Sequence, residues 1–146
     1  MISYADISSL KPLQIQNVSD DFLAVGADID SRRISAGMLF IARKGEATDG
    51  HRFIGQALKN GAVASVVEND WYAMASPSRD WPLIVVPDSD VALRELALSV
   101  RQKFDHPVFG ITGSNGKTTT KEMLAAILGQ KFNALATAGN YNNLWG

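Results

Sequence analysis

The stretch PVFGITGSNGKTT, residues 107–119, decides the expected fold of this chain. Pro107 to Thr112 is predicted to form a strand, and a glycine-containing turn then leads into a helix over Lys117 to Leu128. The apolar side chains of that helix recur at helical spacing, at Met123, Leu124, Ile127 and Leu128. A strand, a glycine turn and a helix in this order are typical of an α/β protein.

The same alternation extends on both sides of this stretch. Short apolar runs bounded by turn residues predict buried strands over Met38 to Ala42, Ala62 to Val67, Leu83 to Val86 and Asn133 to Thr137. Helical spacing predicts a helix over Phe53 to Asn60, ended by Gly61, and another that Asp88 to Asp90 can cap. We therefore expect an α/β fold with a largely parallel sheet.

Two domains are expected, with a boundary near Val86 to Asp90. Residues 1–86 would form a small N-terminal α/β domain, and residues 87–146 would begin a second α/β domain with a phosphate-binding loop. The chain stops at Gly146, directly after an asparagine-rich loop, so we expect the second domain to be truncated.

Composition excludes several classes of function. The 146 residues include 46% hydrophobic and 20% charged residues, with a net charge of -1 and scattered basic residues, which argues against nucleic-acid binding. There is no cysteine, so a disulfide framework and a thiolate metal site are excluded. Neither a signal peptide nor a long apolar run is present, and we expect a cytoplasmic protein without membrane insertion. The oligomeric state is not indicated.

The turn at residues 113–119 carries the strongest chemical signal. Glycine lets the backbone approach a triphosphate closely, and the N-terminus of the following helix attracts anions. We expect Lys117 to contact the β and γ phosphates of a nucleoside triphosphate, and the Thr118 hydroxyl to ligate Mg²⁺; these two are the candidate catalytic residues. The candidate nucleotide-binding residues are Gly113, Ser114, Asn115, Gly116, Lys117, Thr118 and Thr119.

The general phosphate-loop pattern is matched imperfectly. The position five before Gly116 is Ile111, and glycines occur instead at 110 and 113. The alternative interpretation is that the glycines only shape a turn and that Lys117 is a solvated residue of the first helical turn.

Residues 112–119, TGSNGKTT, resemble the ATP loop of the Mur ligase family and of its relative folylpolyglutamate synthase. In that variant the first glycine is placed as it is here. The continuation KEML at residues 121–124 is similar to the members that add D-alanyl-D-alanine. The resemblance implies that ATP and Mg²⁺ are used.

A second resemblance lies upstream, in DSR at residues 30–32 and DGH at 49–51, with Gly37, Leu39, Phe40, Ala42 and Gly45 between them. These residues are similar to the UDP-sugar-binding domain of the family. The resemblance implies a uridine pocket lined by Ile29, Ser31, Arg32, Glu46, Ala47 and Thr48, with His51 as a further candidate. Without it, Asp30 and Ser31 would be a turn or cap, Arg32 a surface cation, and His51 a packed or exposed imidazole.

A third resemblance is TAGNYNN at residues 137–143, which is similar to a loop of the D-alanyl-D-alanine-adding members. It implies that Asn140 and Asn143 bind substrate, since an asparagine amide can both donate and accept hydrogen bonds. The alternative is an asparagine-rich turn.

Together the resemblances imply an ATP-dependent ligase of peptidoglycan precursor synthesis. Such an enzyme activates the carboxylate of a UDP-N-acetylmuramoyl tripeptide as an acyl phosphate, which the amine of D-Ala-D-Ala attacks. The alternatives are a diaminopimelate- or lysine-adding member, a UDP-sugar-binding module without turnover, and a structural domain that binds no ligand. We expect this chain alone to be inactive, because the family's other catalytic residues would lie beyond Gly146.

Overall fold

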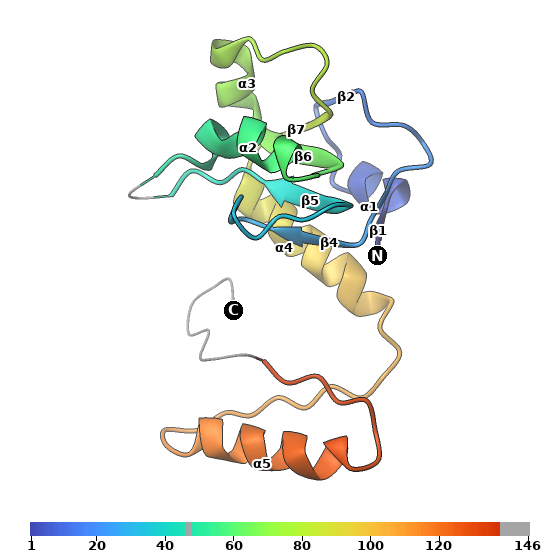
Figure 1. Ribbon diagram of the computed structural model, residues 1–146, viewed down its shortest axis with the longest axis vertical. Coiled ribbons are helices and arrows are strands. Elements are labelled where there is room, and N and C mark those ends of the chain that lie inside the picture. The colour runs from blue at the N-terminus through green and yellow to red at the C-terminus, as the bar shows by residue number, and fades with distance from the viewer. Residues whose placement is uncertain (46–47, 138–146) are drawn as a thin grey trace. The chain divides into compact units, whose positions relative to one another are not determined.

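The computed structural model describes residues 1–45 and 48–137 and divides the chain into two compact units, Met1–Asp105 and His106–Gly146 (Figure 1). The first unit carries the sheet and all but one of the helices described below. Each unit is described by itself.

A five-stranded sheet of order β2-β7-β6-β5-β4 forms the centre of the first unit. Four strands run parallel, and the edge strand β2 pairs antiparallel with β7. The strands are β2 (Gln14–Gln16), β4 (Gly26–Asp28), β5 (Met38–Ile41), β6 (Ala64–Glu68) and β7 (Leu83–Val86). A separate antiparallel pair joins β1 (Ile2–Ser3) to β3 (Leu23–Ala24).

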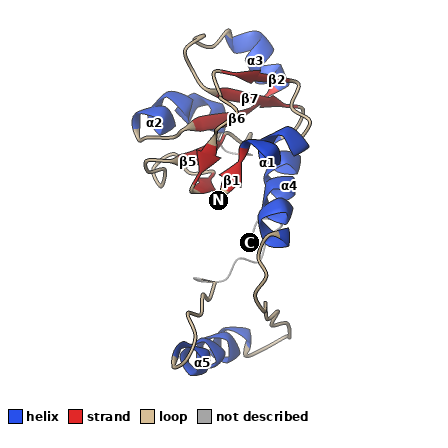
Figure 2. Cartoon of the chain, turned by 90° about the vertical axis from the view of Figure 1, so that its right-hand side faces the viewer, coloured by secondary structure: helices blue, strands red, loops and turns tan. Residues whose placement is uncertain are grey.

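Helices cover both faces of this sheet (Figure 2). The apolar side chains of α1 (Tyr4–Ser9) and α4 (Ser89–Gln102) pack into one core cluster. Those of α2 (Ile54–Lys59), preceded by the 3-10 turn η1 (Gly50–Phe53), and of α3 (Asn69–Ala75) pack into a second cluster. The first unit is therefore a three-layer α/β/α sandwich.

Alternation along the central strands explains the two clusters. In β5, Leu39 and Ile41 join the cluster beneath α1 and α4, whereas Phe40 between them joins the cluster beneath α2 and α3. Successive strand side chains point to opposite faces, so a strand covered on both faces is expected to be largely apolar. The same holds for β7, whose four residues LIVV are all buried.

The second unit contains the helix α5 (Lys117–Gly129). The strands expected over residues 107–112 and 133–137 were wrong, because neither segment is a strand in the described part of the chain. A strand exists only when its backbone hydrogen-bonds to a neighbouring strand, and no pairing within the described residues involves either segment.

The compact units divide after Asp105, later than the boundary expected near residues 86–90. The reason is that α4 buries Ala92 and Leu96 against the sheet of the first unit. The α/β class and the other predicted strands and helices are confirmed, with ends shifted by up to two residues.

Candidate functional site

Two glycines with positive φ shape the backbone of the turn at residues 113–116. Gly113 has a φ of +150° and Gly116 a φ of +75°, both in the region that favours glycine. A side chain at Gly116 would meet open space, so the strained φ, rather than crowding, accounts for a glycine there. Helix α5 begins at Lys117, with Gly116 as its N-cap.

Lys117 folds back across this turn. Its Nζ donates to the carbonyl oxygen of Gly113 at 2.5 Å. The residues from Gly113 to Gly116 and from Thr118 to Thr119 are exposed, and Lys117 is half-buried. The first N–H groups of any helix lack acceptors within it and carry the positive end of its dipole. A positive charge and the backbone donors of the helix end therefore lie together at the start of α5.

The chemistry of this end of α5 also fits Mg²⁺. Thr118 provides a hydroxyl oxygen in the first turn of the helix, of the kind that phosphate loops use for that ion. Within the described residues, no group of three or more His, Cys, Asp or Glu could hold a metal ion by itself. A metal bound here would therefore depend on phosphate oxygens as well as on Thr118.

The turn after β4 places Ser31 and Arg32 at the carboxyl end of that strand. Asp30 accepts from Arg32 Nε at 2.9 Å and from Arg32 Nη2 at 2.6 Å, so the guanidinium is held locally. These hydrogen bonds lower the pKa of Asp30 to about 2. Ser31 is buried and its carbonyl oxygen accepts from Asn60 Nδ2 at 2.8 Å, whereas Ile29 is partly exposed.

The loop after β5 ends in the DGH sequence of residues 49–51. His51 is buried, its Nδ1 lies 2.6 Å from Asp49 Oδ1, and its Nε2 lies 3.0 Å from the Glu68 backbone nitrogen. Burial by itself would raise the pKa of the Asp49 carboxyl, but hydrogen bonds from His51 outweigh it and lower that pKa. Both ring nitrogens of His51 are thus hydrogen-bonded within the protein itself.

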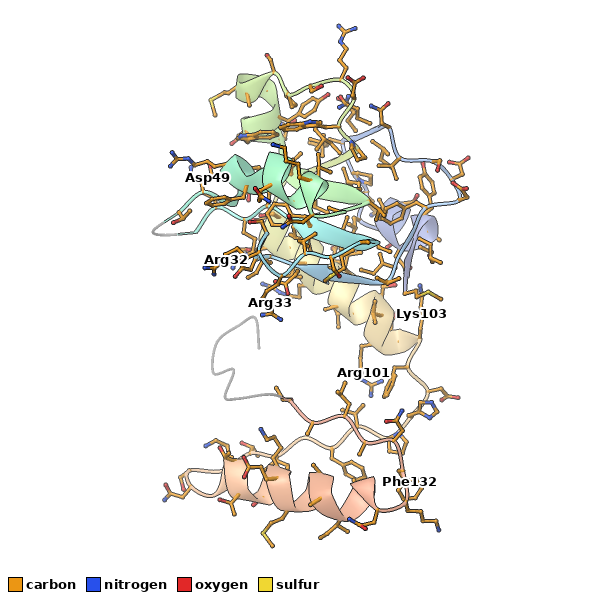
Figure 3. All side chains as sticks on the ribbon, viewed as in Figure 1. Arg32, Arg33, Asp49, Arg101, Lys103 and Phe132 are labelled. Atoms are coloured by element: carbon orange, nitrogen blue, oxygen red, sulfur yellow. The ribbon has the colours of Figure 1, made fainter. Side chains whose placement is uncertain are left out.

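Three of the expected uridine-pocket residues, Ser31, Arg32 and Thr48, lie in loops that follow neighbouring strands of the sheet. Ser31 and Arg32 follow β4, Thr48 follows β5, and both strands run in the same direction. Figure 3 shows Arg32 and Asp49 on the same side of the sheet. Open parallel sheets bind their ligands at the carboxyl ends of the strands. Four of the expected substrate-binding residues, Glu46, Ala47, Asn140 and Asn143, lie outside the described residues.

Comparison with known families now gives two matches in chain order. Residues 25–101 match the model described as Mur ligase family, catalytic domain, and residues 111–146 match that of the Mur ligase middle domain. The first match alone spans more than half of the chain. The chain belongs to the Mur ligase family.

Individual Mur ligases resemble the chain closely. It is 41% identical over 131 residues to the UDP-N-acetylmuramoyl-tripeptide--D-alanyl-D-alanine ligase of Synechocystis, covering 90% of this chain and 28% of the relative. The enzyme of the same name from Escherichia coli is 45% identical over 125 residues, with 81% and 26% covered. The chain thus spans little more than a quarter of the length of these relatives.

A solved Mur ligase structure agrees with the fold. The crystal structure of MurF ligase from Thermotoga maritima in complex with ADP matches with a TM-score of 0.66 and 36% sequence identity. The match covers 85% of this chain and 28% of that one. In both sequence and fold, the chain is therefore similar to Mur ligases of the D-alanyl-D-alanine-adding kind.

Sequence reasoning missed two contacts at the edge of the sheet that carries Ser31 and Thr48. Arg43 forms an ion pair with Asp90 at the start of α4. The Glu68 carboxylate accepts from the Ser89 hydroxyl at 2.7 Å. The partners are 47 and 21 residues apart in the chain. The parallel sheet brings the loop after β5, the end of β6 and the start of α4 together. No regular spacing in the sequence predicts that these residues are in contact.

Proposed function

We propose that this chain is the N-terminal part of an ATP-dependent ligase that joins D-Ala-D-Ala to a UDP-N-acetylmuramoyl tripeptide. The observation that carries the proposal is the turn with two positive-φ glycines that leads into α5 at Lys117. The names of its relatives and the ADP in the Thermotoga maritima structure support it. We assign UDP-sugar binding to the first unit, and ATP binding to residues 113–119 and to parts of the middle domain that follow them.

The proposed chemistry explains why a phosphate loop is needed. A carboxylate oxygen of the tripeptide attacks the γ-phosphorus of ATP, the bond to the bridging oxygen breaks, and ADP leaves. The amine of D-Ala-D-Ala then attacks the acyl carbon, loses a proton and displaces inorganic phosphate. Lys117 stabilises the charge that moves to the phosphate oxygens. Thr118 would hold Mg²⁺, which supplies further neutralisation of that charge.

We propose that the uridine pocket is lined by exposed residues of the first unit that follow its parallel strands. Ile29 and Thr48 offer accessible side chains, and Arg32 offers a guanidinium that a phosphate can share with Asp30. Ser31, which is buried, contributes through its turn more than through its hydroxyl. Glu46, Ala47, Asn140 and Asn143 remain proposals from family resemblance.

No helix in the described residues is long and apolar enough to cross a membrane. Since the proposed reaction consumes ATP, we propose that it takes place in the cytoplasm.

The phosphate loop is tested by replacing its lysine. We expect Lys117→Ala to weaken ATP–Mg²⁺ binding at least about tenfold, because a point charge on the β and γ phosphates is lost. Isothermal titration of the 146-residue chain and of the variant measures this. Lys131→Ala, which removes an exposed lysine beyond the end of α5, should bind as the wild type does. Equal affinities for wild type and Lys117→Ala would refute the assignment.

Titration with UDP-N-acetylmuramoyl peptides separates the alternatives. Binding of the tripeptide in preference to the dipeptide supports the D-alanyl-D-alanine-adding enzyme, and the reverse order supports a diaminopimelate- or lysine-adding member. Uridine binding without ATP binding supports a binding module, and no thermal shift with either ligand supports a structural domain. We expect no ligation by this chain; ADP release that requires both peptide substrates would contradict that expectation.

A further inference from the structure

The two ends of the loop after β5 are tied to each other at its base. We call residues 43–45 and 48–50 the β5 arm. The Gly50 N–H donates to the Arg43 carbonyl oxygen at 2.7 Å, and the Gly45 N–H donates to the Thr48 carbonyl oxygen at 3.0 Å. A side-chain carbon on Gly50 would lie 2.7 Å from the Arg43 oxygen, so these backbones touch. The orientation of Thr48 therefore depends on how this base is held.

His51 holds one end of the base. The Glu68 N–H can only donate, so Nε2 of His51 accepts from it, and Nδ1 carries the hydrogen that is donated to Asp49. The His51 N–H also donates to the Asp49 carboxylate at 3.0 Å. The imidazole thus bridges the β5 arm and the end of β6.

The imidazole itself cannot easily move. Its ring stacks on Trp71 with centroids 5.0 Å apart and an interplanar angle of 20°. The side chain is 1% exposed. Packing on Trp71 and two hydrogen bonds hold the ring in one orientation. We call the contacts from Asp49 through His51 to Glu68 the first strut.

A second strut, the ion pair between Arg43 and Asp90, holds the other end of the base of the β5 arm. Arg43 pairs with Asp90 through Nε and Nη2, and the Nη2–Oδ2 distance is 3.2 Å. Glu68, whose N–H donates to His51, in turn accepts from Ser89 through its carboxylate. Both struts therefore end on neighbouring residues at the start of α4, a helix packed on the sheet core.

We propose that His51 is a positioning residue: through Asp49 and the Glu68 backbone it fixes the β5 arm so that Thr48 is preorganised for the uridine diphosphate part of the substrate. The proposal rests on the uridine pocket proposed above. A loop fixed before binding loses less conformational entropy when the ligand arrives, so affinity is higher than for a loop that must be ordered.

Three variants of His51 test this by isothermal titration with uridine diphosphate. His51→Phe keeps an aromatic ring on Trp71 and loses both hydrogen bonds, and we expect the dissociation constant to rise about tenfold. His51→Asn can still donate to Asp49, and His51→Gln can still accept from Glu68. We expect each to recover part of the lost affinity. Should His51→Phe not fold, the Asn and Gln variants, each missing one bond, still have to bind more weakly than the wild type.

Hydrogen exchange supplies the readout that a general loss of stability would not give. In His51→Phe the amides of Gly50 and Glu68 should exchange faster, while those of β7 should stay protected. Ser99→Ala is the matched control, because it removes a hydrogen bond to the buried Asp6 on the other face of the sheet. It should leave both the uridine diphosphate affinity and the exchange of Gly50 unchanged.

The outcomes distinguish this inference from the function on which it rests. A folded His51→Phe that binds uridine diphosphate as tightly as the wild type overturns the positioning role alone. The positioning role is also overturned if Ser99→Ala weakens uridine diphosphate binding as much as His51→Phe does. A wild-type chain that does not bind uridine diphosphate overturns the proposed pocket, and the positioning role with it.

Discussion

Asp6 is a buried carboxylate that ties the first helix of the chain to the end of α4. It accepts from the Ser3 N–H at 2.7 Å, from the Ser99 hydroxyl and from Lys103 Nζ at 2.6 Å. Burial by itself would raise the pKa of Asp6, but these hydrogen bonds outweigh it and hold the pKa well below its usual range. A buried charge is tolerated here because both carboxylate oxygens accept hydrogen bonds.

We expect Asp6→Asn to lower the free energy of unfolding by about 2 kcal/mol near neutral pH, because the variant leaves Lys103 without its charged partner. A carboxyl whose pKa is lower in the folded state stabilises the fold above its unfolded pKa of about 4 and loses that contribution as pH falls further. The difference between wild type and variant should therefore shrink below about pH 4. Urea unfolding at several pH values measures it, and a difference independent of pH would contradict the role of the charge.

At the scale of elements, α4 shows how one cap and one apolar face determine a helix. Asp88 accepts from the Asp90 N–H at 2.8 Å and from the Val91 N–H at 2.9 Å, which satisfies two of the backbone donors at the helix start. Ala92 and Leu96, four residues apart, lie on the face that is buried against the sheet. The same helix start holds Ser89 and Asp90, which anchor the two struts of the β5 arm.

Asp88→Ala should lower the free energy of unfolding by about 1 kcal/mol, the usual cost of losing an N-cap acceptor. Asp88→Asn is the control, because its amide oxygen can accept the same hydrogen bonds and should restore most of the stability. Thermal unfolding followed by circular dichroism compares the three proteins. If Asp88→Asn is as unstable as Asp88→Ala, the negative charge rather than the cap geometry matters.

At the scale of the whole molecule, the buried core belongs to the first unit. Every buried hydrophobic residue among those described lies between Ile2 and Leu96. Helix α5 has no buried residue, and Met123 and Ile127 on its apolar face are exposed. A helix of its length is marginal in water without packing.

A fragment of residues 1–105 should therefore unfold with the same thermal midpoint, within about 2 °C, as the 146-residue chain. Differential scanning calorimetry of both proteins tests this, and hydrogen exchange should show rapid exchange along α5 in the longer one. A clearly lower midpoint for the fragment would show that residues beyond 105 stabilise the first unit.

Sequence patterns predicted correctly those elements that depend on neighbouring residues. The run LIVV at residues 83–86 predicted a buried strand, Asp88 a cap and Gly116-Lys117 the start of a helix, and each is observed. The edge strands β2 and β4 have three residues each, half-buried or exposed, so their composition carried no strand signal. The α3 helix was missed for a similar reason: within NDWYAMA no residue is buried, and its aromatic side chains only lie against the core.

By itself, the sequence determined the α/β class, the glycine turn that leads into α5, and the family, because these depend on neighbouring residues and on the order of short motifs. Only the tertiary structure decided that α4 belongs to the first unit and that His51 faces inward, between Asp49 and the end of β6. The physical reason is that burial and hydrogen bonding of a side chain depend on residues far away in the chain. Parallel strands bring such residues together at their carboxyl ends, and no local sequence pattern predicts these contacts.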